Sequence, residues 1–185
     1  GRSLARERLG AGDFLLWLAG NHLAVLPVLE ELGPDTLVIQ FDAHLDIHAF
    51  HDSQPELSHG NFLLHAGKPL PKLINIGHRD LLLPSSEIEA VFEATWSAED
   101  VACDAGEVVR QLRKRVKAAK RVWIDLDCDA LAPAFLPAVQ HPLPFGLTPQ
   151  NLLQFVVAIG FNKLAGVSIS EFDPGRDIRD TSLNL

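Results

Sequence analysis

Two short acidic segments carry the residues of this chain whose types and spacing are most able to do chemistry. Residues 42–46 have the sequence DAHLD and follow the apolar stretch 36–41, and residues 125–129 have the sequence DLDCD and follow the apolar stretch 121–124. In both segments an ionisable side chain recurs at every second position, so an extended backbone points these side chains in one direction. If the chain turns after His44 instead, the ionisable groups of 42–46 can still converge on one point.

Carboxylates gathered on one face of a buried strand repel one another, and burying an unpaired carboxylate is costly. A bound divalent cation supplies the compensating charge. Donor sets that are rich in oxygen and include one or two imidazoles suit Mn²⁺ better than Zn²⁺. The two segments therefore predict a metal site, and the alternative is a buried polar network that holds no metal.

Short apolar stretches alternate with amphipathic ones along the chain, and these elements must position the acidic segments. An alternation of strands and helices predicts an α/β fold, a three-layer αβα arrangement with a doubly wound, mainly parallel sheet. Ligands of such sheets bind at the carboxyl ends of the strands, which is where both acidic segments fall. Strands are expected at Thr36–Phe41, Lys72–Gly77, Arg121–Leu126 and Leu164–Ser170, and helices at 23–32, 61–66, Ser85–Glu93, Ala105–Ala119 and Thr148–Gly160.

The sequence also predicts which residues begin two of the helices and which two segments form loops. Ser85 or Ser86 is expected to cap the helix over 85–93, and Thr148 followed by Pro149 is a favourable start for the last helix. Residues 47–58 and the proline-containing segment 130–147 are expected to be loops, the second of them ordered.

Length and composition narrow the class of protein. With 185 residues the chain is expected to form a single domain over 1–185, and 16 basic against 24 acidic residues give a net charge of −8. The acidic balance argues against binding to duplex nucleic acid or to an anionic membrane. No apolar stretch approaches the roughly 20 residues needed to span a bilayer, and two cysteines without paired spacing favour a reducing, cytoplasmic location. Because the chain contains no methionine, a trimmed chain or a fragment is expected.

Taken together, the two acidic segments resemble the ureohydrolase superfamily, which includes arginase, agmatinase, formimidoylglutamase and guanidinobutyrase. The first family signature, DAHxD, matches 42–46, and the second, DxDxxDPxF, resembles 127–135. The matches follow the family's order and cover residues 14 to 177. Four shorter matches accompany them: 18–22 resembles the turn that carries the first metal-binding histidine, 58–60 the histidine after the metal loop, 76–80 the IGxR stretch, and 171–174 the late ExxP segment.

The resemblance implies an arginase-like metallohydrolase domain that lacks some terminal elements of the family and binds two Mn²⁺ ions per chain. Asp42 and Asp127 would bridge the two ions together with a water. Asp125 aligns with a family serine, so it is expected to support the site rather than to bind metal. One ion would take His22, Asp42, Asp46 and Asp127, and the other would take Asp42, His44, Asp127 and Asp129.

The implied reaction is that of a hydrolase acting on the C–N bonds of linear amidines. A hydroxide shared by the two ions would attack a guanidino or formimino carbon and release urea or a related amide. Asp46 would orient the hydroxide, Glu171 would pair with the guanidinium, and His59 would shuttle the proton to the leaving amine. His48 is assigned to the substrate pocket, and the alternative is that it lies in a solvated loop. For His141, entry into the pocket is one of the possibilities.

Several departures from the family pattern bear on function. Asn21 replaces an acidic residue beside the first metal histidine, and Ala132 replaces an aspartate before Pro133. The positions at which arginase contacts the amino-acid head group do not match, since they are occupied here by His48, Pro55 and Leu82, so arginine is disfavoured among small guanidino substrates.

Two alternatives stay open at this point. One is a zinc-dependent, deacetylase-like amidohydrolase on the same architecture, and the other is a catalytically degenerate arginase-like binding protein. The family resemblance further implies a homo-oligomer, a trimer or hexamer.

Overall fold

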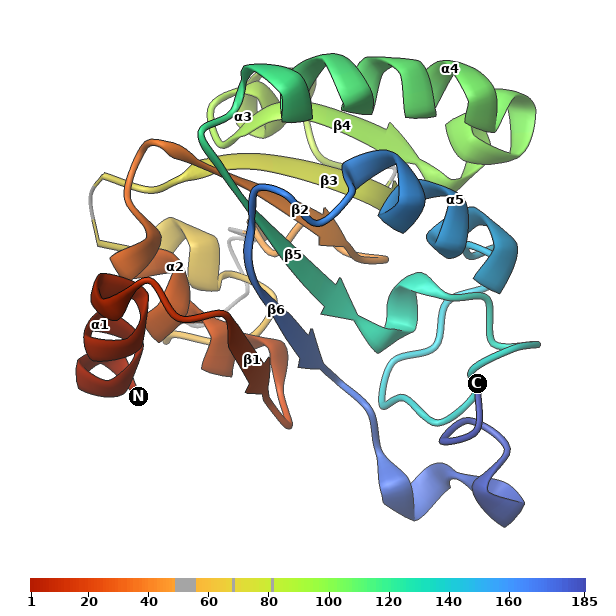
Figure 1. The fold of residues 1–185 in the computed structure, drawn as a ribbon. Helices are drawn as coiled ribbons and strands as arrows, with labels where there is room; N and C mark the ends of the chain where they lie inside the picture. The colour runs from red at the N-terminus through yellow and green to blue at the C-terminus, as the bar shows by residue number, and fades with distance from the viewer. Residues whose placement is uncertain (49–55, 68, 81) are drawn as a thin grey trace.

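A computed structural model of the chain describes residues 1–48, 56–67, 69–80 and 82–185. Within these residues a six-stranded sheet has the order β1-β6-β5-β2-β3-β4, and all neighbouring strands run parallel (Figure 1). The predicted parallel sheet is confirmed. The strands are β1 (Leu15–Leu18), β2 (Thr36–Phe41), β3 (Lys72–His78), β4 (Phe92–Ser97), β5 (Arg121–Asp127) and β6 (Leu164–Ser170).

Helices cover both faces of this sheet. The helices α1 (Arg2–Ala11) and α2 (Leu26–Leu32) lie on one face, and α4 (Ala98–Ala118) and α5 (Pro149–Ile159) lie on the other (Figure 1). This confirms the three-layer α/β arrangement. Among the described residues, no helix combines the length and hydropathy needed to cross a membrane. The remaining short elements are α3 (Ser85–Glu89) and the 3₁₀ turns η1 (His22–Val25), η2 (Phe62–His65), η3 (Cys128–Ala130), η4 (Pro174–Arg176) and η5 (Ile178–Asp180).

The central strand β2 shows why the sequence forms this core. Every residue of β2 is buried, as expected for a strand covered on both faces. Ile39 and Phe41 belong to the apolar cluster beneath α4 and α5, whereas Val38 belongs to the cluster beneath α1 and α2. Trp123 of β5 fills the second cluster, and only a glycine fits at position 166 because a Cβ there would meet the indole ring at 2.3 Å.

The region between β3 and α4 differs from the prediction. The helix expected over Ser85–Glu93 ends at Glu89, and Pro84, not Ser85 or Ser86, occupies its N-cap position. The following residues form β4, a strand that was not predicted. Residues 92–97 alternate apolar and polar side chains, which is the period of a half-buried edge strand.

The long helix α4 also begins earlier than predicted. Ser97 and Asp100 form reciprocal hydrogen bonds that cap it at Ala98, seven residues before the expected start at Ala105. Asp104 has a non-helical backbone inside this helix and marks a kink, so the first turns do not share the apolar periodicity of the rest. The helix α1 was not predicted either.

Other boundaries agree closely with the expectation. Thr148 caps α5, with Pro149 at the first helical position. The helix expected over 61–66 is the short 3₁₀ turn η2. Pro55 and most of the loop expected at 47–58 lie outside the described residues.

Candidate metal centre and active site

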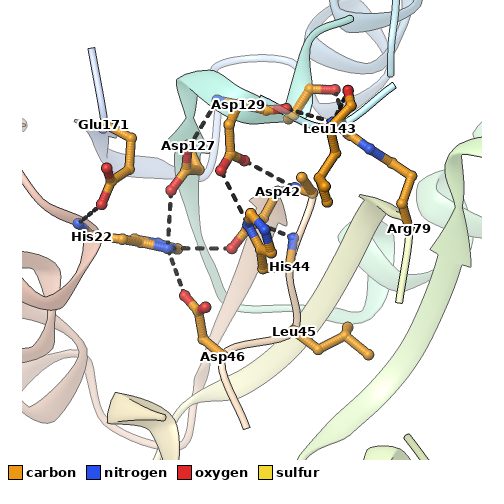
Figure 2. A network of polar contacts seen from close by, with 12 residues as sticks. His22, Asp42, His44, Leu45, Asp46, Arg79, Asp127, Asp129, Leu143 and Glu171 are labelled. Carbon is orange, nitrogen blue, oxygen red and sulfur yellow. Dashed lines mark hydrogen bonds and ion pairs between the residues drawn. The ribbon is translucent and has the colours of Figure 1, made fainter. Parts of the chain in front are cut away.

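The predicted ligands meet where adjacent strands end. β5 pairs with β2 on one side and with β6 on the other, so the carboxyl ends of these strands lie side by side. Asp42 directly follows β2, Asp127 is the last residue of β5, and Glu171 directly follows β6. Figure 2 shows these side chains pointing toward one another. The structure brings together all the side chains proposed as ligands, namely His22, Asp42, His44, Asp46, Asp127 and Asp129.

The backbone of residues 42–46 reaches this arrangement through a turn, whereas Asp125 and Asp127 lie in the extended strand β5. β2 ends at Phe41, and the carboxylate of Asp42 then accepts a 2.7 Å hydrogen bond from the backbone N–H of His44. Asp46 has a φ of +52° and Glu171 a φ of +62°. A non-glycine residue in the left-handed region costs roughly 1–2 kcal/mol, and here the two strained residues are side chains predicted to be catalytic. For residues 42–46 the structure therefore shows the turning chain and not the extended one, and it brings Asp42 and Asp46 close to His22 and His44 close to Asp42.

His22 lies at the centre of the first group. Its Nε2 lies 2.9 Å from Oδ2 of Asp125, so this nitrogen donates its proton to that carboxylate. Its Nδ1 then faces carboxylate oxygens of Asp46 at 2.8 Å, Asp42 at 3.2 Å and Asp127 at 3.3 Å. Nδ1 of His22 and Oδ2 of Asp46 are nevertheless buried without a hydrogen-bond partner. An imidazole lone pair that converges with carboxylates on one point fits a divalent cation.

A second group adjoins the first. Nδ1 of His44 lies 3.0 Å from Oδ2 of Asp129 and 3.7 Å from Oδ1 of Asp42. Within each group, one donor atom per residue lies within 4.8 Å of every other, and the two groups share Asp42. The donor atoms therefore suit two neighbouring cations. The first group consists of His22, Asp42 and Asp127, and the second of Asp42, His44 and Asp129.

The pKa values of this cluster are shifted as expected for crowded, buried acids. Burial, together with the charge of Asp46, raises the pKa of Asp42 to about 7, and burial beside Asp42 raises the pKa of Asp127 well above its usual value. Burial alone would lower the pKa of His44, but the carboxylate of Asp129 raises it to about 9. The metal-free cluster therefore holds protons near neutral pH.

These pKa directions predict a proton release when metal binds. Both Asp42 and His44 have folded-state pKa values above their unfolded ones, so their contribution to stability is complete at low pH and falls as the pH rises through about 7 and about 9. Metal requires both groups deprotonated, so Mn²⁺ affinity should increase from pH 6 to pH 9. Calorimetry at pH 7 in two buffers of different ionisation enthalpy measures the released protons, and an equal heat in both buffers would contradict this arrangement.

All the proposed metal ligands except Asp42 line a cavity of about 230 Å³, which is also lined by the other predicted site residues. Oε1 of Glu171 accepts a 2.8 Å hydrogen bond from the backbone N–H of His22 and lies 3.8 Å from Nδ1 of His59. His48 lines the same cavity, with its Nε2 3.0 Å from Oδ2 of Asp80. The cavity is lined by His22, His44, Asp46, His48, His59, Gly60, Asp127, Asp129, His141 and Glu171.

The structure also shows residues whose contribution the sequence reasoning underrated. His141 lines the cavity, and its ring stacks on that of His59 with the centroids 5.3 Å apart. The side chain of Asn21, which replaces the family's acidic residue, accepts a 2.9 Å hydrogen bond from Leu23 N–H and so caps the turn that presents His22. The local sequence indicates the cap at Asn21, since asparagine is a favoured N-cap residue. It gives no indication that His141 stacks on His59, because these residues lie far apart in the sequence.

Asp125 is a supporting residue with a testable contribution. Besides His22 it accepts hydrogen bonds from Gln40 Nε2 at 3.1 Å and Ser168 Oγ at 2.5 Å, so both of its carboxylate oxygens accept hydrogen bonds. In Asp125→Asn the side-chain amide NH₂ replaces one of these acceptor oxygens and faces donor groups, so the hydrogen bonds that orient His22 are disturbed. It should lower Mn²⁺ affinity about ten- to a hundred-fold, the usual effect of removing a ligand-orienting partner. Titration calorimetry against Asp35→Asn, an exposed control, tests this; equal affinities would show that Asp125 does not orient His22.

Comparisons with known proteins agree with this fold. The chain is 32% identical over 183 residues to N(1)-aminopropylagmatine ureohydrolase of Thermus thermophilus, a match that covers 94% of the chain and 59% of the relative. It superposes with a TM-score of 0.81 and 26% identity on a hypothetical agmatinase of Burkholderia thailandensis, over 98% of this chain and 58% of that one. Entamoeba histolytica arginase in complex with L-ornithine shares the fold, with a TM-score of 0.83 at 22% identity, over 99% of this chain and 70% of that one.

The curated relatives are longer than this chain, which spans between 46% and 60% of the length of those it matches. The model of the Arginase family matches residues 2–185, which is nearly the whole chain. The six predicted ligands lie together at the strand ends of the matched domain. This chain belongs to the arginase family.

Proposed function

We propose that this chain carries the active site of a Mn²⁺-dependent amidinohydrolase that releases urea or a related amide from a small guanidino or formimino compound. The observation that carries the proposal is the pair of overlapping ligand groups that share Asp42 and face one cavity with Glu171 and His59. Relatives named agmatinase and N(1)-aminopropylagmatine ureohydrolase support the same reaction class.

Two divalent ions would lie in the two groups described above. When bound, such a pair lowers the pKa of a water so that a nucleophile is available near neutral pH. Mn²⁺ is proposed because the donors are mainly carboxylate oxygens with one imidazole per group. One ion would be held by His22, Asp42, Asp46 and Asp127, and the other by Asp42, His44, Asp127 and Asp129.

The side chains around the metal groups have complementary tasks. The carboxylate of Glu171 would accept N–H groups of a guanidinium, whose fork geometry a carboxylate fits. Asp46 would accept a hydrogen bond from the attacking water and orient it. His59 would deliver a proton to the leaving amine, because imidazole exchanges protons near neutral pH. His48 would contact the part of the substrate that extends from the guanidino group. The single-domain organisation, the trimer or hexamer and the cytoplasmic location stay predictions.

A urea-release screen tests the proposal. The purified protein with added Mn²⁺ is assayed on agmatine, 4-guanidinobutyrate and arginine, and formamide release is followed with a formimino substrate. We expect turnover of at least one substrate other than arginine, with two ions bound per chain. A single tightly held Zn²⁺ together with acetate release from an acetylated amine would favour the deacetylase alternative. Full metal occupancy without turnover of any of these substrates would contradict the proposal and favour a binding protein.

A further inference from the structure

The guanidinium of Arg79 hydrogen-bonds only to main-chain carbonyl groups among the contacts found in the described residues. Its Nη1 donates to the carbonyl oxygens of Gly77 at 3.2 Å and Ala130 at 3.1 Å, and its Nη2 donates to those of Asp129 at 2.9 Å and Leu143 at 3.1 Å. Figure 2 shows the side chain reaching from its strand toward the Asp129 turn and Leu143. One planar group thus joins three segments that are far apart in sequence.

Each of these segments bears on the proposed active site. Gly77 belongs to β3, and Asp129 and Ala130 lie in the turn η3 that carries one of the proposed ligands. Leu143 lies in the loop 130–147, two residues after His141, whose ring stacks on that of His59. Arg79 therefore connects the turn that carries Asp129 to the loop that carries His141, whose ring stacks on the proposed proton shuttle His59.

Among the described residues, the main-chain hydrogen bonds of the loop 130–147 involve 130–139 and Leu147, and none involves 140–146, the stretch that carries His141. The hydrogen bond from Arg79 to the carbonyl of Leu143 therefore ties this stretch to the rest of the site. The two ends of the loop are joined by hydrogen bonds between Ala132 and Leu147 and between Leu147 and Ala130, each 2.9 Å long. A guanidinium presents its donors in a fixed plane and can serve several carbonyls at once, whereas the ammonium of lysine is a single point of charge on a flexible stem. The backbone N–H of Arg79 also donates to the carbonyl of Ala43, which lies between Asp42 and His44, at 2.8 Å.

We infer that Arg79 is a positioning residue that holds the Asp129 turn and the His141-bearing loop in register, and so sets both the second metal group and the stacked pair of His59 and His141. Arg79 touches neither substrate nor the reacting atoms in this role. The inference rests on the proposed function, since it presumes that Asp129 binds metal and that His59 moves a proton.

Arg79→Lys and Arg79→Gln test the inference, and Lys163→Met is the matched control. Lys163 likewise donates to three main-chain carbonyls, those of Val116 at 3.1 Å, Lys117 at 2.8 Å and Ala119 at 2.6 Å. It directly precedes β6 and so lies at the opposite end of the sheet from the site. The control therefore removes a comparable set of hydrogen bonds without touching the proposed active site.

We expect Arg79→Lys to weaken one of the two Mn²⁺ binding events about ten- to a hundred-fold. The control Lys163→Met should bind both Mn²⁺ ions with the affinity of the parent protein. Electron paramagnetic resonance should show single Mn²⁺ ions in the Arg79 variants at a Mn²⁺ concentration that gives coupled pairs in the parent. The pH profile of urea release should shift in the Arg79 variants only, because the surroundings of His59 change. Circular dichroism and thermal unfolding confirm that each variant is folded.

Several results would overturn the inference. Parental metal affinity and an unchanged pH profile in a folded Arg79→Lys protein would show that Arg79 does not set the site. An equal loss of affinity in Lys163→Met would show a general effect of lower stability. An unfolded Arg79→Lys protein beside a folded control would assign Arg79 to the stability of the fold. If the parent itself binds no Mn²⁺, the proposed function fails first, and the inference fails with it.

Discussion

Asp127→Asn is expected to abolish the binding of Mn²⁺ at concentrations that saturate the parent protein and to leave the fold intact. Asp127 is buried at the end of β5, and its Oδ2 lies 3.3 Å from Nδ1 of His22. Removing one charged partner from a buried cluster costs about 3–5 kcal/mol, which is roughly two to four orders of magnitude in affinity. Urea release should be lost together with the metal. The measurement is the number of Mn²⁺ ions bound per chain, by titration calorimetry.

The same substitution should not destabilise the metal-free protein. Oδ1 of Asp127 accepts a 2.9 Å hydrogen bond from the backbone N–H of Asp129, and the amide oxygen of asparagine can accept it too. Because Asp127 is buried beside Asp42 and Asp129, removing its charge also relieves repulsion. Thermal unfolding without metal should therefore show a melting temperature equal to or above that of the parent. Asp13→Asn, at an exposed position, is the matched control. Full Mn²⁺ occupancy in Asp127→Asn would show that the ligands are assigned wrongly.

Glu171→Gln should lower kcat/KM for a guanidino substrate by at least about thirty-fold and leave metal binding unchanged. The amide keeps an oxygen that can accept the hydrogen bond from the backbone N–H of His22, so the position of that ligand is preserved. It loses the negative charge that would pair with the guanidinium. Leaving a buried charge without its partner costs about 2–5 kcal/mol, and the initial rate of urea release measures the effect.

A neutral competitor separates binding from chemistry in this variant. If Glu171 pairs with the cation, free guanidinium should inhibit the parent at lower concentration than it inhibits Glu171→Gln. Urea, which is neutral, should inhibit the two proteins similarly. Parental activity in Glu171→Gln with two Mn²⁺ ions bound would remove Glu171 from the site. A loss of metal would instead show that its main task is to hold His22.

Patterns that are local in sequence predicted most of the fold and the ligands. Thr36–Phe41 and Leu164–Ser170 were predicted with their observed boundaries. Thr36–Phe41 is buried throughout, as expected for a central strand of a parallel sheet, whereas buried and half-buried residues alternate along most of Leu164–Ser170. Asp42 and Asp127 were assigned because they follow predicted strands, and parallel strands bring their carboxyl ends to one edge of the sheet. The resemblance to the ureohydrolases then supplied His22 and His59, whose distance along the chain from these segments gives no local signal.

What was missed depends on contacts between segments that are distant in sequence. β4 lies at the edge of the sheet, and its mostly half-buried side chains lack the continuous apolar run that marks a central strand. The stacking of His141 on His59 and the four carbonyl contacts of Arg79 arise from the path of the loop 130–147, which no periodicity determines. The left-handed backbone of Asp46 and Glu171 is likewise imposed by the assembled site.

The central claim is that two metal ions lie side by side at the carboxyl ends of β2 and β5. Anomalous diffraction at the manganese absorption edge, from crystals grown with Mn²⁺, tests it most directly. We predict two anomalous peaks per chain, one between His22 and Asp46 and the other between His44 and Asp129, with Asp42 and Asp127 in contact with both. A single peak, or peaks away from these side chains, would contradict the account.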